Sequence, residues 1–451
     1  MSEFVQRHAS KVIGTLSGFD RLLFRGTLLR LANVAGLLSF LSYTKVLLKD
    51  FGDWSSELTE RVKRRSLEMA EESGRSVRYL PDPSVRKEEL ARRIAGQEGI
   101  EQGLVCLFSA VEPCLSYEIH RNAQTKKLEL QPRRRRCLHH YHYWMHPEMG
   151  LCHARVQTWL PFNVFVCVNG REWLARQMDG AGIGYRRREN CFVEIADLAK
   201  AQQLMDRQLK TNWSSALNQM ARQASPGHVE LFGSSSTCPI DMYWSAQQSE
   251  WATDVLRFLG KRVPENRNAH PCFKGQVLSD LKDRPEGMRL KHAVDGNSVK
   301  MYDKQGSVLR IETTINQPEQ FKVYRGTQED PGKKDWRPLR KGVADLHRRA
   351  QVSQSSNQRY LKAMAAIDSS TPLKDLAAKL CRPVKRKGRR ARALNPLALQ
   401  DATLLAAVSR GEFLVNGFRN RDMRALLHGS DPKNPAEKRR RSAAGWRNSA
   451  A

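Results

Sequence analysis

The chain has 451 residues, of which 40% are hydrophobic, so it is long enough for about two to four domains and too apolar for general disorder. Lys and Arg number 76 against 47 Asp and Glu, a net charge of +29, which predicts a polyanionic partner: nucleic acid, an anionic membrane surface or an acidic protein. The apolar run at residues 37–48 is broken by polar residues, so we expect no membrane span. Glu3 stands where a secretion leader would be basic, which predicts a cytoplasmic protein. The nine Cys include no C-x-x-C pair, which argues against a disulfide framework or a zinc ribbon.

The first region, residues 1–112, is predicted to combine helices with an α/β unit. Between Glu3 and Gly74 the apolar residues recur at helical spacing, which predicts two or three helices. The later segments are predicted to form, in order, a short strand, a helix that begins after Ser84 and a buried strand: residues 76–80, 85–94 and 103–108.

The second region, residues 113–232, is predicted to hold a meander sheet followed by helices. Five segments have strand-like composition: 115–120, 127–130, 137–146, 151–160 and 163–168. The third and fourth are joined by Pro147-Glu148-Met149-Gly150, which has the composition of a turn. Helices are expected over residues 171–178, 198–209 and 213–224. A Gly- and Ser-rich stretch then predicts a soft boundary between residues 232 and 239.

The third region, residues 239–330, is predicted to contain a hairpin after two helices. The helices are expected near residues 248–259 and 273–281, and the hairpin strands at residues 298–303 and 307–315. The loop Lys304-Gln305-Gly306 fits a three-residue connection with Gly306 in the left-handed position. This loop would pair Met301 with Leu309 and Val299 with Ile311, so that the apolar residues share one face.

The rest of the chain is predicted to be mainly helical and strongly basic. We expect a helical region at residues 333–383, a basic linker at 384–395 and a basic module at 396–451. From Lys333 to Ala451 there are 28 Lys and Arg against 9 Asp and Glu, so most of the positive surplus lies here. Such a concentration is typical of a nucleic-acid footprint. Together the regions predict an α+β fold with a central antiparallel sheet, flanking helices and a basic helical C-terminal module.

Several runs of basic residues are candidate phosphate contacts. Forked guanidinium groups suit phosphate oxygens, and each neutralised phosphate adds salt-dependent affinity. For the linker run the alternative is a solvated, disordered segment. The candidate contacts are Arg133, Arg134, Arg135, Arg136, Arg186, Arg187, Arg188, Lys385, Arg386, Lys387, Arg389, Arg390 and Arg392, with a further run at residues 438–441.

The C-terminal module contains two predicted helices across a turn. The helices are expected at residues 401–408 and 418–427, with the turn at 411–417. Residues 396–444 resemble the opening of a winged-helix domain of bacterial regulators and mobile-element proteins. The resemblance implies DNA binding, with the reading half of such a domain truncated, and adds Arg419, Arg421 and Arg424 to the candidate contacts. The alternative is a helical hairpin that packs on the core.

Residues 139–144 form a cluster of His and aromatic residues. If residues 147–150 are the loop, strand alternation opposes three pairs: His140 with Gln157, His142 with Arg155, and Trp144 with His153. Three imidazoles on one polar face could bind a divalent metal, so the candidate ligands are His140, His142 and His153. Trp144 and Arg155 are candidate nucleic-acid contacts on the same face.

His140-Tyr141-His142 resembles the His-hydrophobic-His metal motif of rolling-circle replication initiators, relaxases and related transposases. In those families a tyrosine attacks a DNA phosphodiester while the metal polarises the scissile phosphate. The resemblance implies a divalent metal ion as cofactor. The alternative is an exposed strand that stacks bases or faces solvent.

The predicted hairpin at residues 298–315 carries a candidate nucleophile. Its Tyr-x-Lys sequence followed by Leu-Arg-Ile-Glu resembles a hairpin of plasmid and phage replication initiators. The resemblance implies that Tyr302 is the nucleophile and that a neighbouring lysine stabilises phosphate charge. The candidate catalytic residues are therefore Tyr302, Lys300, Lys304, Arg310 and Glu312. The alternative is a cross-strand charge network beside a half-buried Tyr302.

These features predict a nucleic-acid-binding protein of a mobile element or replicon, with DNA favoured over RNA. The sequence has no phosphate-loop motif, which argues against an ATP-driven motor. Three hypotheses remain open: a replication initiator or transposase that uses the three histidines and Tyr302, a DNA-binding regulator without chemistry, and a structured-RNA binder. In the last case Trp144, Tyr141 or Tyr143 would stack on bases.

Overall fold

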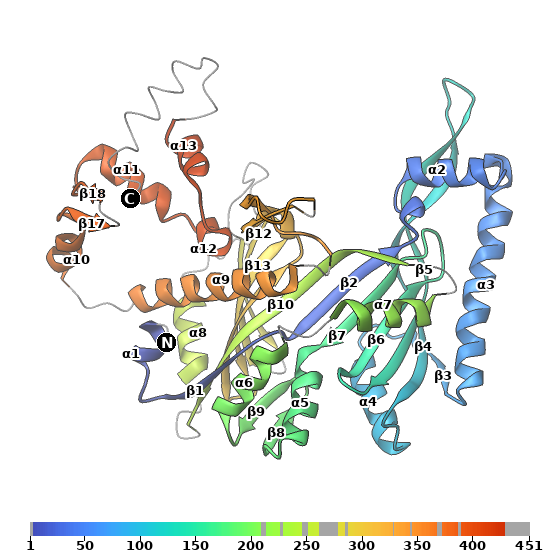
Figure 1. Cartoon of the computed structure of the whole chain (residues 1–451), viewed down its shortest axis with the longest axis horizontal. Coiled ribbons are helices and arrows are strands. Elements are labelled where there is room, and N and C mark those ends of the chain that lie inside the picture. The colour runs from blue at the N-terminus through green and yellow to red at the C-terminus, as the bar shows by residue number, and fades with distance from the viewer. Residues whose placement is uncertain are drawn as a thin grey trace.

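The chain adopts an α+β fold in which one large sheet is flanked by helices (Figure 1). The computed structural model describes the following residues: 3–208, 213–225, 229–245, 251–260, 278–284, 287–327, 329–342, 345–367, 372–386 and 389–428. Helices α2 and α3 lie at one end of the molecule, and α9 with the C-terminal helices lies at the other (Figure 1).

Within these described ranges, twelve strands form the large sheet, in the order β11-β12-β13-β14-β10-β2-β7-β6-β5-β4-β3, with β1 paired to β10. Adjacent strands in this sheet run antiparallel, except β3 and β4, which are parallel. The strand bounds are β1 Val12–Ser17, β2 Arg21–Thr27, β3 Val77–Tyr79, β4 Gly103–Arg121, β5 Leu128–His146, β6 Gly150–Gln157, β7 Val164–Asn169, β10 Glu230–Trp244, β11 Leu278–Arg284, β12 Gly287–Val294, β13 Asn297–Lys304 and β14 Val308–Ile315.

The described part of the chain also contains three small antiparallel hairpins that stand apart from this sheet. Their strands are β8 Tyr185–Arg188 with β9 Cys191–Ile195, β15 Lys322–Arg325 with β16 Asp335–Pro338, and β17 Val384–Arg386 with β18 Arg389–Ala391. The last of these falls within the expected basic linker.

The helices cover the sheet and build the C-terminal module. Their bounds are α1 Glu3–Arg7, α2 Val34–Tyr43, α3 Phe51–Glu72, α4 Lys87–Gln97, α5 Gly170–Gly180, α6 Leu198–Gln208, α7 Trp213–Ala224, α8 Trp251–Gly260, α9 Leu346–Ile367, α10 Leu373–Leu380, α11 Leu399–Val408, α12 Glu412–Asn416 and α13 Asn420–His428, with short 3-10 turns at η1 Leu29–Leu31, η2 Leu48–Asp50 and η4 Pro318–Gln320. Among the described residues, no helix is both long and apolar enough to cross a membrane.

The N-terminal residues correct one prediction, because β1 and β2 are strands where helical spacing predicted helices. In β2 the burial alternates with a period of two: Leu22 and Phe24 are buried, whereas Arg21 and Arg25 are exposed. Pairing with β7 and β10 fixes this strand, and such tertiary pairing overrides local helical spacing. The predicted helices farther along this region and the strand–helix–strand unit are confirmed as α2, α3 and β3-α4-β4.

Strand β10 joins the two halves of the sheet, and the boundary expected between residues 232 and 239 is therefore wrong. Its first half pairs with β2, and its second half pairs with β14 and β1. The Ser-rich stretch predicted a loop, but its small side chains lie within the strand, where Ser235 Oγ donates to Asn316 Oδ1 at 2.6 Å. The boundary at 112/113 likewise falls inside β4. The helix expected at 273–281 lies mostly outside the described residues, and residues 278–281 begin β11.

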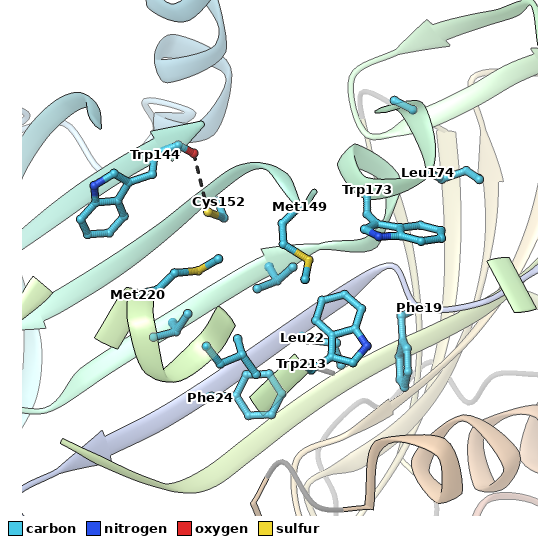
Figure 2. Close-up of a cluster of buried hydrophobic side chains, with 14 of the residues drawn as sticks. Phe19, Leu22, Phe24, Trp144, Met149, Cys152, Trp173, Leu174, Trp213 and Met220 are labelled. Carbon is cyan, nitrogen blue, oxygen red and sulfur yellow. Dashed lines mark hydrogen bonds between the residues drawn. The ribbon is translucent and has the colours of Figure 1, made fainter. Parts of the chain in front are cut away.

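The largest hydrophobic core lies between the sheet and helices α5, α6 and α7. Figure 2 shows Phe19, Trp173 and Trp213 together in this cluster, with Trp144 at its other side. The Cys152 thiol donates to the Trp144 carbonyl at 3.6 Å (Figure 2). A second core lies around β13, β14, α8 and α9. Trp144, a predicted nucleic-acid contact, is only 7% exposed and therefore offers little surface to a ligand.

Candidate functional site

A polar cavity of about 650 Å³ lies where the β13–β14 hairpin meets β2, β5, β6 and the start of α4. This cavity, the central cleft, is bordered by side chains from both halves of the sheet. Its lining includes Asp20, Arg21, Lys87, Glu88, Tyr141, Tyr143, His153, Arg188, Asn190, Lys300, Tyr302, Lys304, Arg310 and Glu312.

The five predicted catalytic residues all line the central cleft. The register of β13 and β14 pairs Lys300 with Glu312 and Tyr302 with Arg310. Lys300 Nζ lies 3.1 Å from Glu312 Oε1, and Lys304 Nζ lies 5.0 Å from the centre of the Tyr302 ring. The cross-strand charge network that we considered as the alternative is therefore present.

Tyr302 is held in its protonated form. Burial and the charge of Glu312 raise the pKa of Tyr302 well above its ordinary value, against the opposing effect of Arg289 and Arg310. A phenol in this state is a weak nucleophile at neutral pH unless a base takes its proton. Attack by this residue would need such a base.

Two aspartates and two arginines form a buried quartet at the floor of the cleft. Arg310 Nε donates to Asp241 Oδ1 at 2.6 Å, and its Nη1 lies 3.2 Å from Asp20 Oδ2. Arg171 Nη2 donates to Asp241 Oδ2 at 2.7 Å, and its Nε lies 3.7 Å from Asp20 Oδ1. Burial alone would raise the pKa of Asp20, but Arg310 and Arg171 outweigh it and hold the pKa below its ordinary value.

A close backbone approach helps to place this quartet. A Cβ atom on Gly170 would lie 2.0 Å from the carbonyl oxygen of Phe19, so only glycine fits there. Gly170 N donates to the carbonyl of Asp20 at 2.6 Å. Because Arg171 follows directly, the contact brings its guanidinium beside the Asp20 carboxylate.

The predicted register of β5 and β6 is wrong by one residue. The loop between them has three residues, because His146 pairs with Gly150, and Tyr143 therefore opposes His153 while His142 opposes Ala154. A one-residue shift moves every side chain of a strand to the other face. His140 and His142 therefore lie on one face of the sheet, and His153 lies on the other.

His140 and His142 are buried and His153 is half-buried, and all three side chains are neutral. The His142 ring stacks on Trp144 at 5.4 Å, whereas His153 lies 4.8 Å from the Tyr143 ring on the cleft side. Burial lowers the pKa of His140 to about 4 and the pKa of His142 and His153 to about 3. Within the described part of the chain, neither ring nitrogen of His142 has a hydrogen-bond partner.

The predicted metal site at His140, His142 and His153 does not form, because the sheet separates its members. In the part of the chain that the structure describes, no three His, Cys, Asp or Glu side chains are placed to hold a metal ion.

No protein-family model, curated protein or solved structure matches this chain. The candidate functional surfaces are therefore defined by geometry and charge alone.

The arginine run at residues 133–136 lies on the long β4–β5 hairpin and is partly neutralised. Arg133 and Arg135 both form ion pairs with Glu118, the latter at 3.4 Å. Arg136 Nη2 donates to the carbonyl of Val111 at 3.1 Å, and Arg134 is exposed. The hairpin thus offers Arg134 and Arg136 on one face as phosphate contacts.

The basic residues near the central cleft are paired with acids in most cases. Arg186 lies 3.2 Å from Glu194, and Arg187 lies 2.6 Å from Glu172. Arg155 lies 2.9 Å from Glu112. Arg188 is exposed and lines the cleft. The lining of the cleft itself has eight Lys and Arg against five Asp and Glu, so the cleft keeps a surplus of positive charge.

The expected linker at 384–395 contains the β17–β18 hairpin. Its register places Lys385 opposite Arg390 and Arg386 opposite Arg389, and like charges that face each other destabilise a hairpin. Arg392 Nη1 donates to Asp401 Oδ2 at 2.9 Å. Lys387 and the side chains of Arg386 and Arg389 lie outside the described residues.

Of the C-terminal helices, α12 packs on the second core, whereas α11 and α13 contact each other. The predicted helices are confirmed as α11 and α13, and the expected turn at 411–417 is largely the short helix α12. Val415 is buried, and its carbonyl accepts hydrogen bonds from Ser356 Oγ at 2.6 Å and Arg359 Nη2 at 2.8 Å. Residues 429–451, with the run at 438–441, lie outside the described residues.

A second and larger cavity, of about 1120 Å³, lies between the β15–β16 hairpin, α9 and the α12–α13 segment. This cavity, the C-terminal groove, has more cations than acids in its lining. The cations are Lys322, Arg348, Arg359, Arg410, Arg419 and Arg421, and the acids are Asp295, Glu412 and Asp422. Burial and the charges of Arg419 and Arg421 lower the pKa of Lys322, which indicates crowded positive charge. Arg424, the third predicted contact on this segment, is partly exposed on α13.

Sequence reasoning missed two aromatic residues on the rim of this groove. Tyr324 is 57% exposed and Trp336 is 63% exposed, and both line the groove. The available signal was the segment Lys333–Lys341, in which one tryptophan is surrounded by five Lys and Arg. Aromatic residues among cations are typical of surfaces that bind single-stranded nucleic acid.

Proposed function

We propose that this chain binds nucleic acid, with DNA favoured, and that the C-terminal groove is its main contact surface. The observation that carries the proposal is the lining of the groove, in which six cations face three acids. Anions of the sugar-phosphate backbone would relieve the mutual repulsion of Lys322, Arg419 and Arg421. The chain's net charge of +29 supports the same class of partner.

The β17–β18 hairpin extends this proposed surface. Two of its three cross-strand pairs join cationic residues, so the hairpin gains stability when a polyanion lies along it. The central cleft also has more cations than acids in its lining, although Arg21 lies 2.9 Å from Glu88 and Lys300 lies 3.1 Å from Glu312. We prefer the groove because it is the larger of the two cavities and has exposed aromatic rings beside its cations.

The first prediction tests this surface by charge reversal. The double variant Lys322→Glu/Arg421→Glu should bind a duplex oligonucleotide at least about 10-fold more weakly at 0.1 M salt, because two phosphate contacts are lost. In a plot of the logarithm of the binding constant against the logarithm of the salt concentration, the slope should become less steep by about two. Fluorescence anisotropy across a salt series measures both quantities.

A matched control carries the same charge change at the other end of the molecule. Lys49 on η2 and Arg61 on α3 are exposed, and α3 lies at the end of the molecule opposite the C-terminal helices (Figure 1). Lys49→Glu/Arg61→Glu should therefore keep most of the salt dependence of binding. If the two double variants lose affinity for the oligonucleotide equally, the binding surface lies outside the groove. If the wild-type chain binds neither DNA nor RNA in dilute buffer, the proposed function is wrong.

A second candidate function is cleavage or joining of DNA phosphodiesters in the central cleft. One observation favours it: the five residues that the sequence singled out, including Tyr302 and Lys304, do line a single cavity. In this proposal the cations of the cleft would stabilise the charge of a scissile phosphate. The raised pKa of Tyr302 requires a base for attack, so the activity should rise with pH.

The second prediction tests this activity on supercoiled plasmid with added Mg²⁺ or Mn²⁺. Nicking by the wild-type chain should be abolished in Tyr302→Phe and retained in Tyr79→Phe, whose ring is exposed on β3. An intact plasmid after incubation with the folded wild-type chain would rule out nicking while leaving the binding proposal in place.

A further inference from the structure

The rim of the C-terminal groove carries an exposed pair of aromatic rings. The register of β15 and β16 places Tyr324 directly opposite Trp336. Their ring centroids are 5.8 Å apart, with an angle of 57° between the planes. Among the tryptophans that the structure describes, Trp336 is the one whose side chain is mostly exposed.

The hairpin is anchored to the body of the protein by other residues. Val323 and Phe321 are buried in the second core, while Arg325 Nη2 donates to the carbonyl of Pro338 at 2.9 Å and its Nε lies 3.5 Å from buried Asp345. Strand alternation then leaves Tyr324 on the outer side, opposite to Val323. The two exposed rings therefore add little to the anchoring of the hairpin.

A second aromatic pair lines the same groove from the α12–α13 side. The rings of Phe413 and Phe418 are 5.3 Å apart, and Phe418 is 45% exposed. Lys322 and Arg421 belong to the same lining, so cations lie among the aromatic rings. A groove with ring faces and cations suits a ligand that has flat apolar rings along an anionic backbone.

We propose that the C-terminal groove binds unpaired nucleotides, whose bases stack on Tyr324 and Trp336 while the phosphates contact Lys322 and Arg421. This inference rests on the proposed function and specifies the form of nucleic acid that the groove takes. Bases in a duplex hide their ring faces in the stack, whereas a single strand exposes them. The groove is therefore selective for single strands, loops or unwound segments, and tolerant of base sequence.

The test compares oligonucleotides of one sequence as a single strand and as a blunt duplex, with the full chain. The single strand should bind at least about 10-fold more tightly at 0.2 M salt, where phosphate contacts are weakened. Trp336→Ala and Tyr324→Ala should each weaken single-strand binding by about 5- to 100-fold, the range expected for the loss of one stacked base. Duplex binding should weaken by a clearly smaller factor than single-strand binding in both variants.

Conservative and distant variants separate stacking from damage to the hairpin. Trp336→Phe keeps a flat ring and should restore most of the single-strand affinity, and Tyr324→Phe should behave like the wild type. Tyr43→Ala removes an exposed ring from α2, at the far end of the molecule (Figure 1), and should have no effect. Thermal unfolding of each variant verifies that the fold is intact.

The outcomes distinguish the two levels of the proposal. If the chain binds single strand and duplex equally and the alanine variants match the wild type, this inference fails while nucleic-acid binding stands. If no polynucleotide binds at all, the proposed function itself fails. If the alanine variants lose affinity for duplex and single strand to the same extent, the rings support the surface without stacking on bases, and the inference is again overturned.

Discussion

At the scale of single residues, burial changes the chemistry that a residue type suggests. His140, His142 and His153 were predicted as metal ligands because imidazole is a good ligand, but His140 and His142 are buried, His153 is half-buried, and all three are neutral. The residue types could be read from the sequence, whereas their exposure depends on helices and strands that are distant in the chain. In contrast, Lys300 and Glu312 could be paired from the sequence, because one short hairpin carries both.

The third prediction concerns the stability of the protein in acid. Burial lowers the pKa of His142 to about 3 in the folded chain, while an unfolded histidine titrates near 6.5. Between these values the unfolded state binds a proton that the folded state does not, so stability falls as the pH drops below about 6.5. From pH 6.5 to pH 5 the loss from this residue should be about 2 kcal/mol.

Denaturant unfolding at pH 7.5 and pH 5 measures this loss. In His142→Phe, which keeps a flat ring against Trp144, the difference in unfolding free energy between the two pH values should shrink by about 2 kcal/mol. His120→Gln serves as the control, because His120 is exposed on β4, and it should leave the difference unchanged. An unaltered pH dependence in His142→Phe would show that His142 accepts a proton in the folded state.

At the scale of elements, the effect of a wrong strand register depends on whether the shift is an even or an odd number of residues. In the β13–β14 hairpin, Met301 pairs with Ile311 where we expected Leu309, a shift of two residues. Such a shift keeps every side chain on its face, so the predicted clustering of Lys300, Tyr302, Arg310 and Glu312 is confirmed. Gly306 adopts the predicted left-handed conformation, with a φ value of 61°. Gln305 before it is also left-handed, with a φ value of 58°.

The β5–β6 hairpin shows the opposite case. Its loop is one residue shorter than expected, and this single residue removes His153 from the face of His140 and His142. Both faces of β5 are buried near this hairpin, so the alternation of polar and apolar residues could not fix the register from the sequence. The predicted register of β5 and β6 therefore depended on the assumed loop length alone. In a strand with two buried faces, the residue pattern does not show which side chains share a face.

At the scale of the whole molecule, one continuous sheet replaces the separate regions that the sequence suggested. Composition and turn residues predicted the helices and hairpins well, but the pairing of β2 with β10 joins residues about 200 positions apart. Such non-local pairings leave no periodic signal in either strand. The quartet of Asp20, Arg171, Asp241 and Arg310 draws on the same long-range contacts, and it lies where the two halves of the sheet meet.

The fourth prediction tests whether this quartet holds the halves together. Asp241 is fully buried and accepts hydrogen bonds from Arg171 and Arg310. Asp241→Asn removes one of two anions and leaves a buried positive charge without a partner, which should destabilise the fold by about 3–5 kcal/mol. Glu194→Gln breaks an exposed ion pair with Arg186 and should cost less than about 1 kcal/mol. Urea unfolding midpoints compare the two variants.

A second substitution distinguishes charge balance from simple loss of a hydrogen bond. Arg171→Met in the Asp241→Asn background returns the buried cluster to one anion and one cation, since Arg310 still faces Asp20. The double variant should therefore recover part of the stability that Asp241→Asn loses, and the two substitutions should couple by about 1–3 kcal/mol. Additive losses would mean that each arginine is held by its packing and its own hydrogen bonds, and that opposite charges at the junction of the two halves contribute little to the fold.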